Sequence, residues 1–180
     1  MECFKPLTIF AAGLALAGCL VSDEPLFDGA GVSAAPLASG RYEACAEPIE
    51  TDGPDCQMID ITQRDDGAYE FLAQDDDLIF ARFHAISGPD YVVQFADDEG
   101  ENYRYFWGQA KADTMTLVMI WCEELPANLR DAMKRDGLIA QEEGSSTCEA
   151  LKPEAAILAA QAYRDGAATP DSSLKLTPAP

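Results

Sequence analysis

Histidine and basic residues are scarce in this sequence, and the scarcity limits the chemistry that it can perform. The chain of 180 residues has one histidine, His84, and 12 lysines and arginines against 32 aspartates and glutamates, for a formal net charge of −20. One histidine excludes sites built on several imidazoles, and no G-x-S-x-G pattern marks a serine nucleophile. So acidic a chain repels nucleic acid, whereas cationic partners remain favourable. We therefore predict a protein that is not an enzyme, with no catalytic residue, metal site or cofactor.

Long apolar runs are also missing. The run Leu7–Leu16 follows Lys5, is too short to cross a bilayer as a permanent helix, and has the layout of a secretory signal. It ends in Leu16-Ala17-Gly18-Cys19, which resembles the lipobox of bacterial lipoproteins. The resemblance implies that residues 1–18 are a signal peptide, that cleavage falls after Gly18, and that Cys19 is diacylated on sulfur. The alternative is an ordinary signal peptide that is cut elsewhere and leaves Cys19 a plain thiol.

The lipobox resemblance also implies a location. Each buried methylene contributes about 0.8 kcal/mol, so two or three acyl chains on Cys19 would hold the protein on a membrane. Leu20 stands where the enterobacterial sorting rule of the family places an aspartate for retention in the inner membrane. The resemblance therefore implies an outer-membrane protein that faces the periplasm, with a cationic envelope protein as the class of partner that the charge favours.

Gly, Ala, Ser and Pro dominate both ends of the remaining chain. Residues 19–39 have no sustained apolar period, and we predict a flexible tether there. Residues 167–180 have the same character and predict a disordered tail. Between them, residues 40–166 predict one β-rich periplasmic domain with C-terminal helices.

Strand patterns fill the first two thirds of this domain. Short runs rich in β-branched and aromatic residues alternate with turns rich in Asp, Gly and Pro. Because each connection is short, neighbouring strands should pair antiparallel, in a meander or a small barrel. The predicted strands are 41–46, 56–63, 68–73, 78–87, 91–96, 102–110 and 114–122.

Two helices should follow the strands. Pro126 occupies a favoured first-turn position and Gly137 ends the first apolar period, while the second helix should run from about Pro153 to Asp165. The fold class is therefore mainly β, of the α+β type, with the helices packed on an antiparallel meander or small barrel.

Cysteine usage indicates an oxidising compartment. Cys3 would leave with the signal peptide and Cys19 would take lipid, so an even set of four cysteines remains, which three pairings could join. We favour Cys45 with Cys56 across the first hairpin, and Cys122 with Cys148 between the last long strand and the second helix. A hairpin-sized disulfide loop contributes roughly 3 kcal/mol in the chain-entropy model. A metal site is the alternative, but no C-x-x-C pair supports one.

A second, partial resemblance concerns two aromatic segments. Ser87-Gly-Pro-Asp-Tyr91, then Phe106-Trp-Gly108 and a cysteine at position 122, are similar to motifs of the membrane-bound inhibitors of c-type lysozyme. The resemblance implies a small β-barrel lipoprotein that blocks a cationic cell-wall hydrolase, for which an acidic protein is suited. The second segment lacks the family's lysine, and two helices follow that the family does not have.

The strand 102–110 poses one structural question. Tyr103, Tyr105 and Trp107 alternate onto one face, either as core beneath the helices or as an open ligand-facing patch. We favour the core, because aromatic rings bury large areas and the helices need a surface to cover. The sequence thus predicts a lipid-anchored envelope protein with a non-enzymatic binding or scaffolding role. The alternative is an inhibitor of a cell-wall hydrolase.

Overall fold

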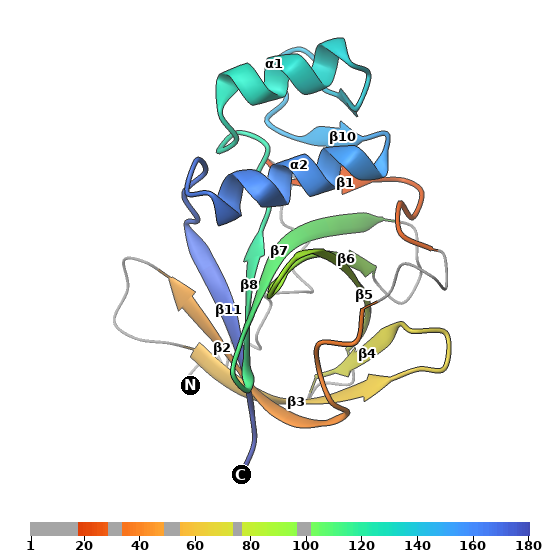
Figure 1. Ribbon diagram of the computed structural model, residues 1–180, viewed down its shortest axis with the longest axis vertical. Coiled ribbons are helices and arrows are strands. Elements are labelled where there is room, and N and C mark those ends of the chain that lie inside the picture. The colour runs from red at the N-terminus through yellow and green to blue at the C-terminus, as the bar shows by residue number, and fades with distance from the viewer. Residues whose placement is uncertain (1–17, 29–33, 49–54, 74–76, 97–101) are drawn as a thin grey trace, which may run out of the picture.

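An antiparallel β-barrel forms the body of the protein, as the sequence predicts. The computed structural model describes residues 18–28, 34–48, 55–73, 77–96 and 102–180. Eight strands close the barrel in the order β6-β5-β4-β3-β2-β11-β8-β7, with β6 and β7 paired (Figure 1). They are β2 (Gly40–Pro48), β3 (Asp55–Gln63), β4 (Tyr69–Leu72), β5 (Leu78–Ser87), β6 (Asp90–Ala96), β7 (Tyr103–Lys111), β8 (Thr114–Met119) and β11 (Ser172–Pro178).

The strand that closes the barrel comes from the region predicted to be a disordered tail, so that prediction is wrong. β11 pairs antiparallel with β2 on one side and with β8 on the other. Leu174 and Leu176 point into the barrel, where they are 8% and 0% exposed, while Lys175 between them is exposed. The alternation Leu-Lys-Leu is a strand pattern, but it is too short to outweigh the flanking Pro and Ser residues in a sequence reading.

The predicted tether is likewise wrong where the structure describes it. β1 (Leu20–Ser22) pairs antiparallel with β7 and parallel with β10 (Cys148–Ala150). Leu20 is fully buried, and Phe27 and Leu37 are buried as well. Three spaced apolar residues are enough to hold this segment, because an exposed edge of the sheet supplies backbone partners. Residues 29–33 of the predicted tether lie outside the described residues.

The two predicted helices are present. α1 (Ala127–Arg135) precedes the short strand β9 (Ile139–Ala140), and α2 (Pro153–Arg164) lies between β10 and β11. Gly137 and Gly166 follow the helices with φ of +63° and +70°, conformations that glycine adopts without strain. Both helices lie beside the same end of the barrel, together with β1 and β10 (Figure 1).

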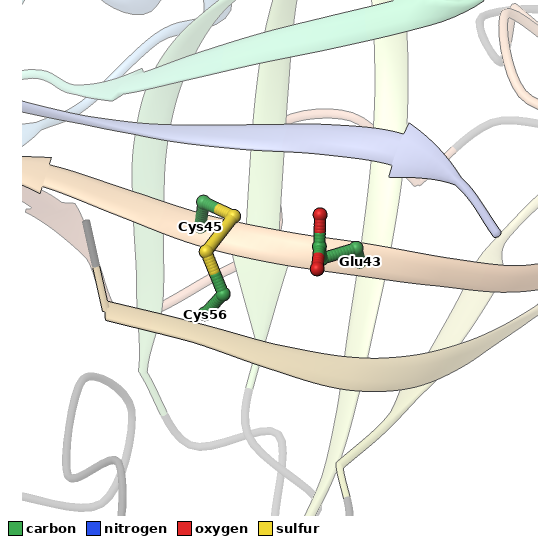
Figure 2. A group of neighbouring side chains, drawn as sticks. All are labelled: Glu43, Cys45 and Cys56. Atoms are coloured by element: carbon green, nitrogen blue, oxygen red, sulfur yellow. A yellow bond between two sulfur atoms is a disulfide. The ribbon is translucent and has the colours of Figure 1, made fainter.

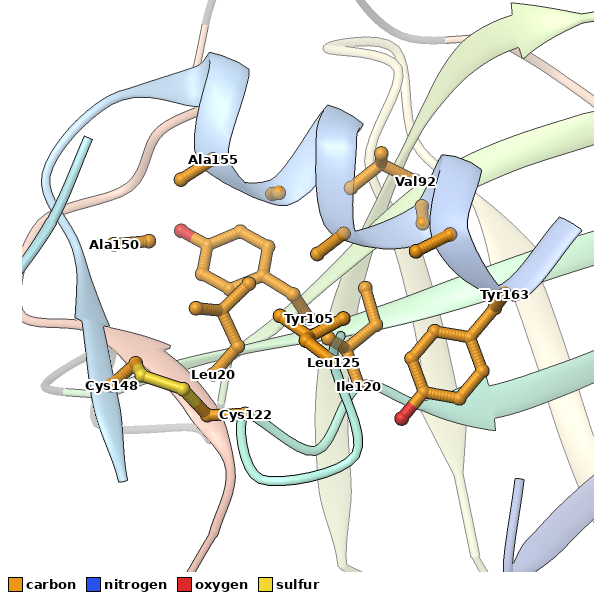
Figure 3. Packing of buried hydrophobic residues seen from close by; sticks show 14 of the residues in the cluster. Leu20, Val92, Tyr105, Ile120, Cys122, Leu125, Cys148, Ala150, Ala155 and Tyr163 are labelled. Carbon is orange, nitrogen blue, oxygen red and sulfur yellow. A yellow bond between two sulfur atoms is a disulfide. The ribbon is translucent and has the colours of Figure 1, made fainter. Parts of the chain in front are cut away.

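Two apolar cores result from this arrangement. One fills the barrel with inward side chains such as Phe83, Phe95 and Met115. The other lies between the outer face of the barrel and the helices, where the alanines of α2 let that helix approach closely (Figure 3). The buried alanines of α2 are Ala155, Ala156, Ala159, Ala160 and Ala162. The second core holds β1 and one disulfide in place.

Candidate functional site

Cys19, the predicted lipidation site, lies directly before β1. Its backbone bridges to Trp121, and its carbonyl oxygen accepts a hydrogen bond of 3.1 Å from the amide of Cys148. The Cys19 Sγ lies 3.5 Å from the Sδ of Met119, and the residue is only 6% exposed. Burial raises the pKa of the thiol, against a smaller opposing effect of Arg104. In this state the sulfur is neutral and shielded from reagents in solution.

Gly18, the residue before the predicted cleavage point, is held tightly in the uncleaved chain. Its φ is +99°, and a Cβ built on it would lie 2.9 Å from a ring carbon of Trp121 and 3.1 Å from a carboxylate oxygen of Glu123. Its carbonyl accepts a hydrogen bond from the amide of Cys122. Only glycine fits this place, so the folded chain gives a second reason for glycine at a position that the lipobox resemblance also explains.

Both predicted disulfides are present. Cys45 and Cys56 are joined across β2 and β3, at directly opposite positions of the ladder (Figure 2). Cys122 and Cys148 are joined beneath α2 and are both 0% exposed (Figure 3). Among the described residues, Cys19 is the one cysteine outside a disulfide.

The central aromatic of the β7 row belongs to the core, as the sequence predicts. Tyr105 is 0% exposed, and its hydroxyl forms a hydrogen bond of 2.6 Å with the Oγ of Ser22 in β1. Burial raises the pKa of Tyr105 to about 12. Tyr103 and Trp107 are partly buried and pack against the same core. Tyr105 therefore anchors β1 to the barrel, while the two outer rings of the row cover the edge of the same core.

The two segments that resemble lysozyme-inhibitor motifs lie next to each other. The turn between β5 and β6 contains Gly88, with φ of +55°, and its residues 87–89 are exposed. Tyr91 pairs with Gly108, and the buried carboxylate of Asp90 accepts a hydrogen bond of 3.1 Å from the Nε1 of Trp107. Antiparallel pairing of β6 and β7 thus brings the segments together at one rim of the barrel.

His84, the single histidine, stacks on a core ring. Its imidazole lies 4.9 Å from the ring of Phe27, centroid to centroid. Its Nδ1 is buried and has no hydrogen-bond partner within the described part of the chain. Within those same residues, His84 joins no cluster of metal-ligating side chains. His84 is therefore a sheet residue whose ring packs against the core.

An outer cleft of about 350 Å³ is a feature that the sequence does not reveal. Residues from the β3–β4 turn, from β5, β6 and β7 and from the segment after β1 line it, among them Arg64, Asp66, Arg82, Gln94 and Tyr103. No local pattern joins segments so far apart, because the strand register alone brings them together.

Ion pairs occupy the charged end of this cleft. The Nη2 of Arg82 lies 2.8 Å from the Oδ2 of Asp66, and Arg64 pairs with Glu70. The backbone amide of Ala68 and then the Arg82 guanidinium lower the pKa of the Asp66 carboxyl. Both arginines that line the cleft therefore already have a carboxylate partner.

The carboxyl group of Glu124 is hydrogen-bonded to Tyr163 of α2. The Glu124 Oε2 accepts a hydrogen bond of 2.7 Å from the hydroxyl of Tyr163, which itself accepts one of 3.0 Å from the amide of Trp121. Burial, aided by nearby Asp171, raises the pKa of Glu124 despite the hydrogen bond from Tyr163. Burial and the neighbouring Glu124 also raise the pKa of Tyr163. The hydrogen bonds of Tyr163 with Trp121 and Glu124 thus connect α2 to the segment that follows β8.

Comparison with known proteins gives no relative from which a function could be transferred. Scans against family models, curated proteins and solved structures each found no match to the chain. Within the described residues, neither helix has the length and apolar character to span a bilayer.

Proposed function

We propose that the protein is a lipid-anchored protein of the cell envelope, attached through acyl chains on Cys19, with a non-enzymatic binding or scaffolding role. One observation carries the proposal. Cys45, Cys56, Cys122 and Cys148 are consumed in disulfides, so Cys19, the residue that ends the lipobox-like segment, is the described cysteine left for modification. Two disulfides also suit an oxidising compartment such as the periplasm.

The burial of Cys19 fixes the order of events in this proposal. A diacylglyceryl group cannot enter a packed core, so the sulfur must be acylated before β1 joins the sheet. In the folded protein the acyl chains would leave beside Met119 and Trp121, which contact this segment and are only partly buried. Because Leu20 is already in β1, the domain would be held directly at the bilayer surface.

The binding role rests on charge and rigidity. The net charge of −20 favours a cationic partner and speeds its approach at low ionic strength. A closed barrel with a filled interior presents a rigid surface, as a scaffold requires.

The anchor can be tested by one substitution and a matched control. Cys19→Ala should abolish incorporation of labelled palmitate and move the protein from the carbonate-washed membrane pellet to the soluble fraction. Cys3→Ala, which alters the other cysteine outside the two disulfides, should leave both readouts unchanged. A Cys19→Ala protein that stays labelled and membrane-bound would refute the proposal.

An inhibitor of a cell-wall hydrolase is the second candidate. It is favoured by the exposed turn 87–89 lying beside Trp107, which brings the two similar segments to one rim. Titration into a cationic muramidase should then give stoichiometric loss of activity that salt reverses. Inhibition that survives deletion of the side chains at Ser87 and Pro89 would place the contact elsewhere, and turnover in a glycan screen would instead indicate an enzyme.

A further inference from the structure

We propose that Cys45, Cys56 and Glu43 form a zinc site that opens when their disulfide is reduced. The ligand atoms of the three residues all lie within 4.8 Å of one another. Glu43 and Cys56 are exposed and Cys45 is partly so, which leaves the group open to solvent on the outside of the barrel. Figure 2 shows the carboxylate of Glu43 beside the disulfide, on the same pair of strands. The inference is independent of the lipid anchor.

The strand ladder holds these ligands in place whether or not the disulfide is present. Cys45 and Cys56 are directly opposite, with Cα atoms 4.0 Å apart, and the ladder continues on both sides of them. Glu43 is two residues before Cys45 and so shares its face of β2. On reduction, the two thiols therefore remain side by side without rearrangement of the backbone.

Lys175 is exposed on β11 and pairs directly with Cys45, so the two side chains lie on the same face of the sheet.

The chemistry balances with a small thiol as the reductant. Two thiol molecules supply two electrons and two protons, which convert the disulfide to two thiols while the reductant becomes its own disulfide. A zinc ion then displaces both thiol protons and forms two Zn–S bonds, with the Glu43 carboxylate and one water completing the coordination. Tetrahedral bonds of about 2.0–2.3 Å place ligand atoms roughly 3.5–3.8 Å apart, which small side-chain rotations achieve here. Oxidation by a disulfide reverses the exchange and releases the metal.

Mild reduction should open only the Cys45–Cys56 disulfide, because the second disulfide is buried. Cys122 and Cys148 are 0% exposed, so a thiol in solution cannot reach them in the folded protein. β2 also stays paired with β11, and β3 with β4, when the surface disulfide opens. Mild reduction therefore changes one exposed site and leaves the barrel closed.

The test measures zinc binding by the purified full chain, before and after mild reduction, in competition with a chromophoric chelator. We expect one zinc per chain in the reduced form and none in the oxidised form. Cys45→Ser should abolish binding, and Glu43→Gln should weaken it at least about tenfold, the smaller end of the losses seen when metal-site partners are removed. Glu47→Gln is the matched control, since Glu47 is also exposed on this face of β2 but lies outside the cluster.

Three results would overturn the proposal. They are a reduced protein that binds no zinc, equal binding by the oxidised and reduced forms, and equal weakening by Glu43→Gln and Glu47→Gln. Near-ultraviolet circular dichroism of each variant verifies that the barrel is intact, and thiol counting verifies that mild reduction adds only two thiols to those already free.

Discussion

The indole of Trp107 on β7 donates a hydrogen bond to the carboxylate of Asp90, the first residue of β6. Asp90 is only 6% exposed. Gln109 donates to the same oxygen over 3.2 Å. Burying a carboxylate is costly unless it accepts hydrogen bonds, so the bond between Trp107 and Asp90 stabilises the rim of the barrel. The indole ring also contributes by packing against the core.

Trp107→Ala should therefore lower the free energy of unfolding by about 3 kcal/mol, because it removes a packed ring and one donor to Asp90. Urea unfolding followed by far-ultraviolet circular dichroism measures the change. Trp107→Phe retains most of the packing and should cost about 1–2 kcal/mol, the share of the lost hydrogen bond. An unchanged midpoint in both variants would mean that the ring is not part of the core.

Neighbouring residues on β11 should respond in opposite ways. Leu176 is 0% exposed inside the barrel, and Leu176→Ala should cost about 2–5 kcal/mol. Lys175→Ala, on the outer face, should change stability by less than about 0.5 kcal/mol. Thermal and urea midpoints give both values. Equal, small effects at the two positions would show that this segment does not close the barrel.

β1 offers a similar test of the predicted tether. Leu20 is buried among core residues, so Leu20→Ala should destabilise the domain by about 2–5 kcal/mol. Asp23 is exposed just after the strand, and Asp23→Ala is the control, with an expected change within about 0.5 kcal/mol. If the Leu20 variant unfolds with the wild-type midpoint, the segment is a tether after all.

Glu124 should make the protein less stable as pH rises. Its pKa is raised in the folded state, so the folded protein binds this proton more tightly than the unfolded chain does. The free energy of unfolding therefore falls as pH rises from about 4.5 through the raised pKa. Glu124→Gln removes this dependence but keeps an oxygen that can accept the Tyr163 hydrogen bond. The variant should therefore be more stable than the wild type at pH 7, with a flatter stability profile.

Unfolding measured from pH 4 to pH 8 tests this expectation. A Glu124→Gln protein that is less stable at pH 7 would show that the ionised carboxylate stabilises the fold through Tyr163.

The sequence predicts those parts of the fold whose signals are local. The long strands, both helices and both disulfide pairings follow from alternation, caps and cysteine spacing. β1 was missed because it has only three residues, and β11 because its apolar alternation is limited to Leu174-Lys175-Leu176. In both cases the edge that the strand joins also belongs to residues distant in the sequence. The outer cleft was missed for the same reason.

The candidate sites divide in the same way. Cys19 is identified by four consecutive residues, whereas the neighbours that bury it come from β8 and β10 and cannot be read from that segment. Likewise, the spacing of Cys45 and Cys56 predicts a hairpin disulfide, but the nearness of Glu43 and Lys175 follows only from the strand register.

The position of β11 governs when the chain can become a stable domain. Until it is added, β2 and β8 each have one unpaired edge, and such edges pair readily with strands of other molecules. A chain synthesised from its amino end delivers β11 after every other element of the barrel. The growing chain therefore needs protection from aggregation until synthesis is finished, and a product shortened before Ser172 should be a substrate for quality-control proteases rather than a partly active protein.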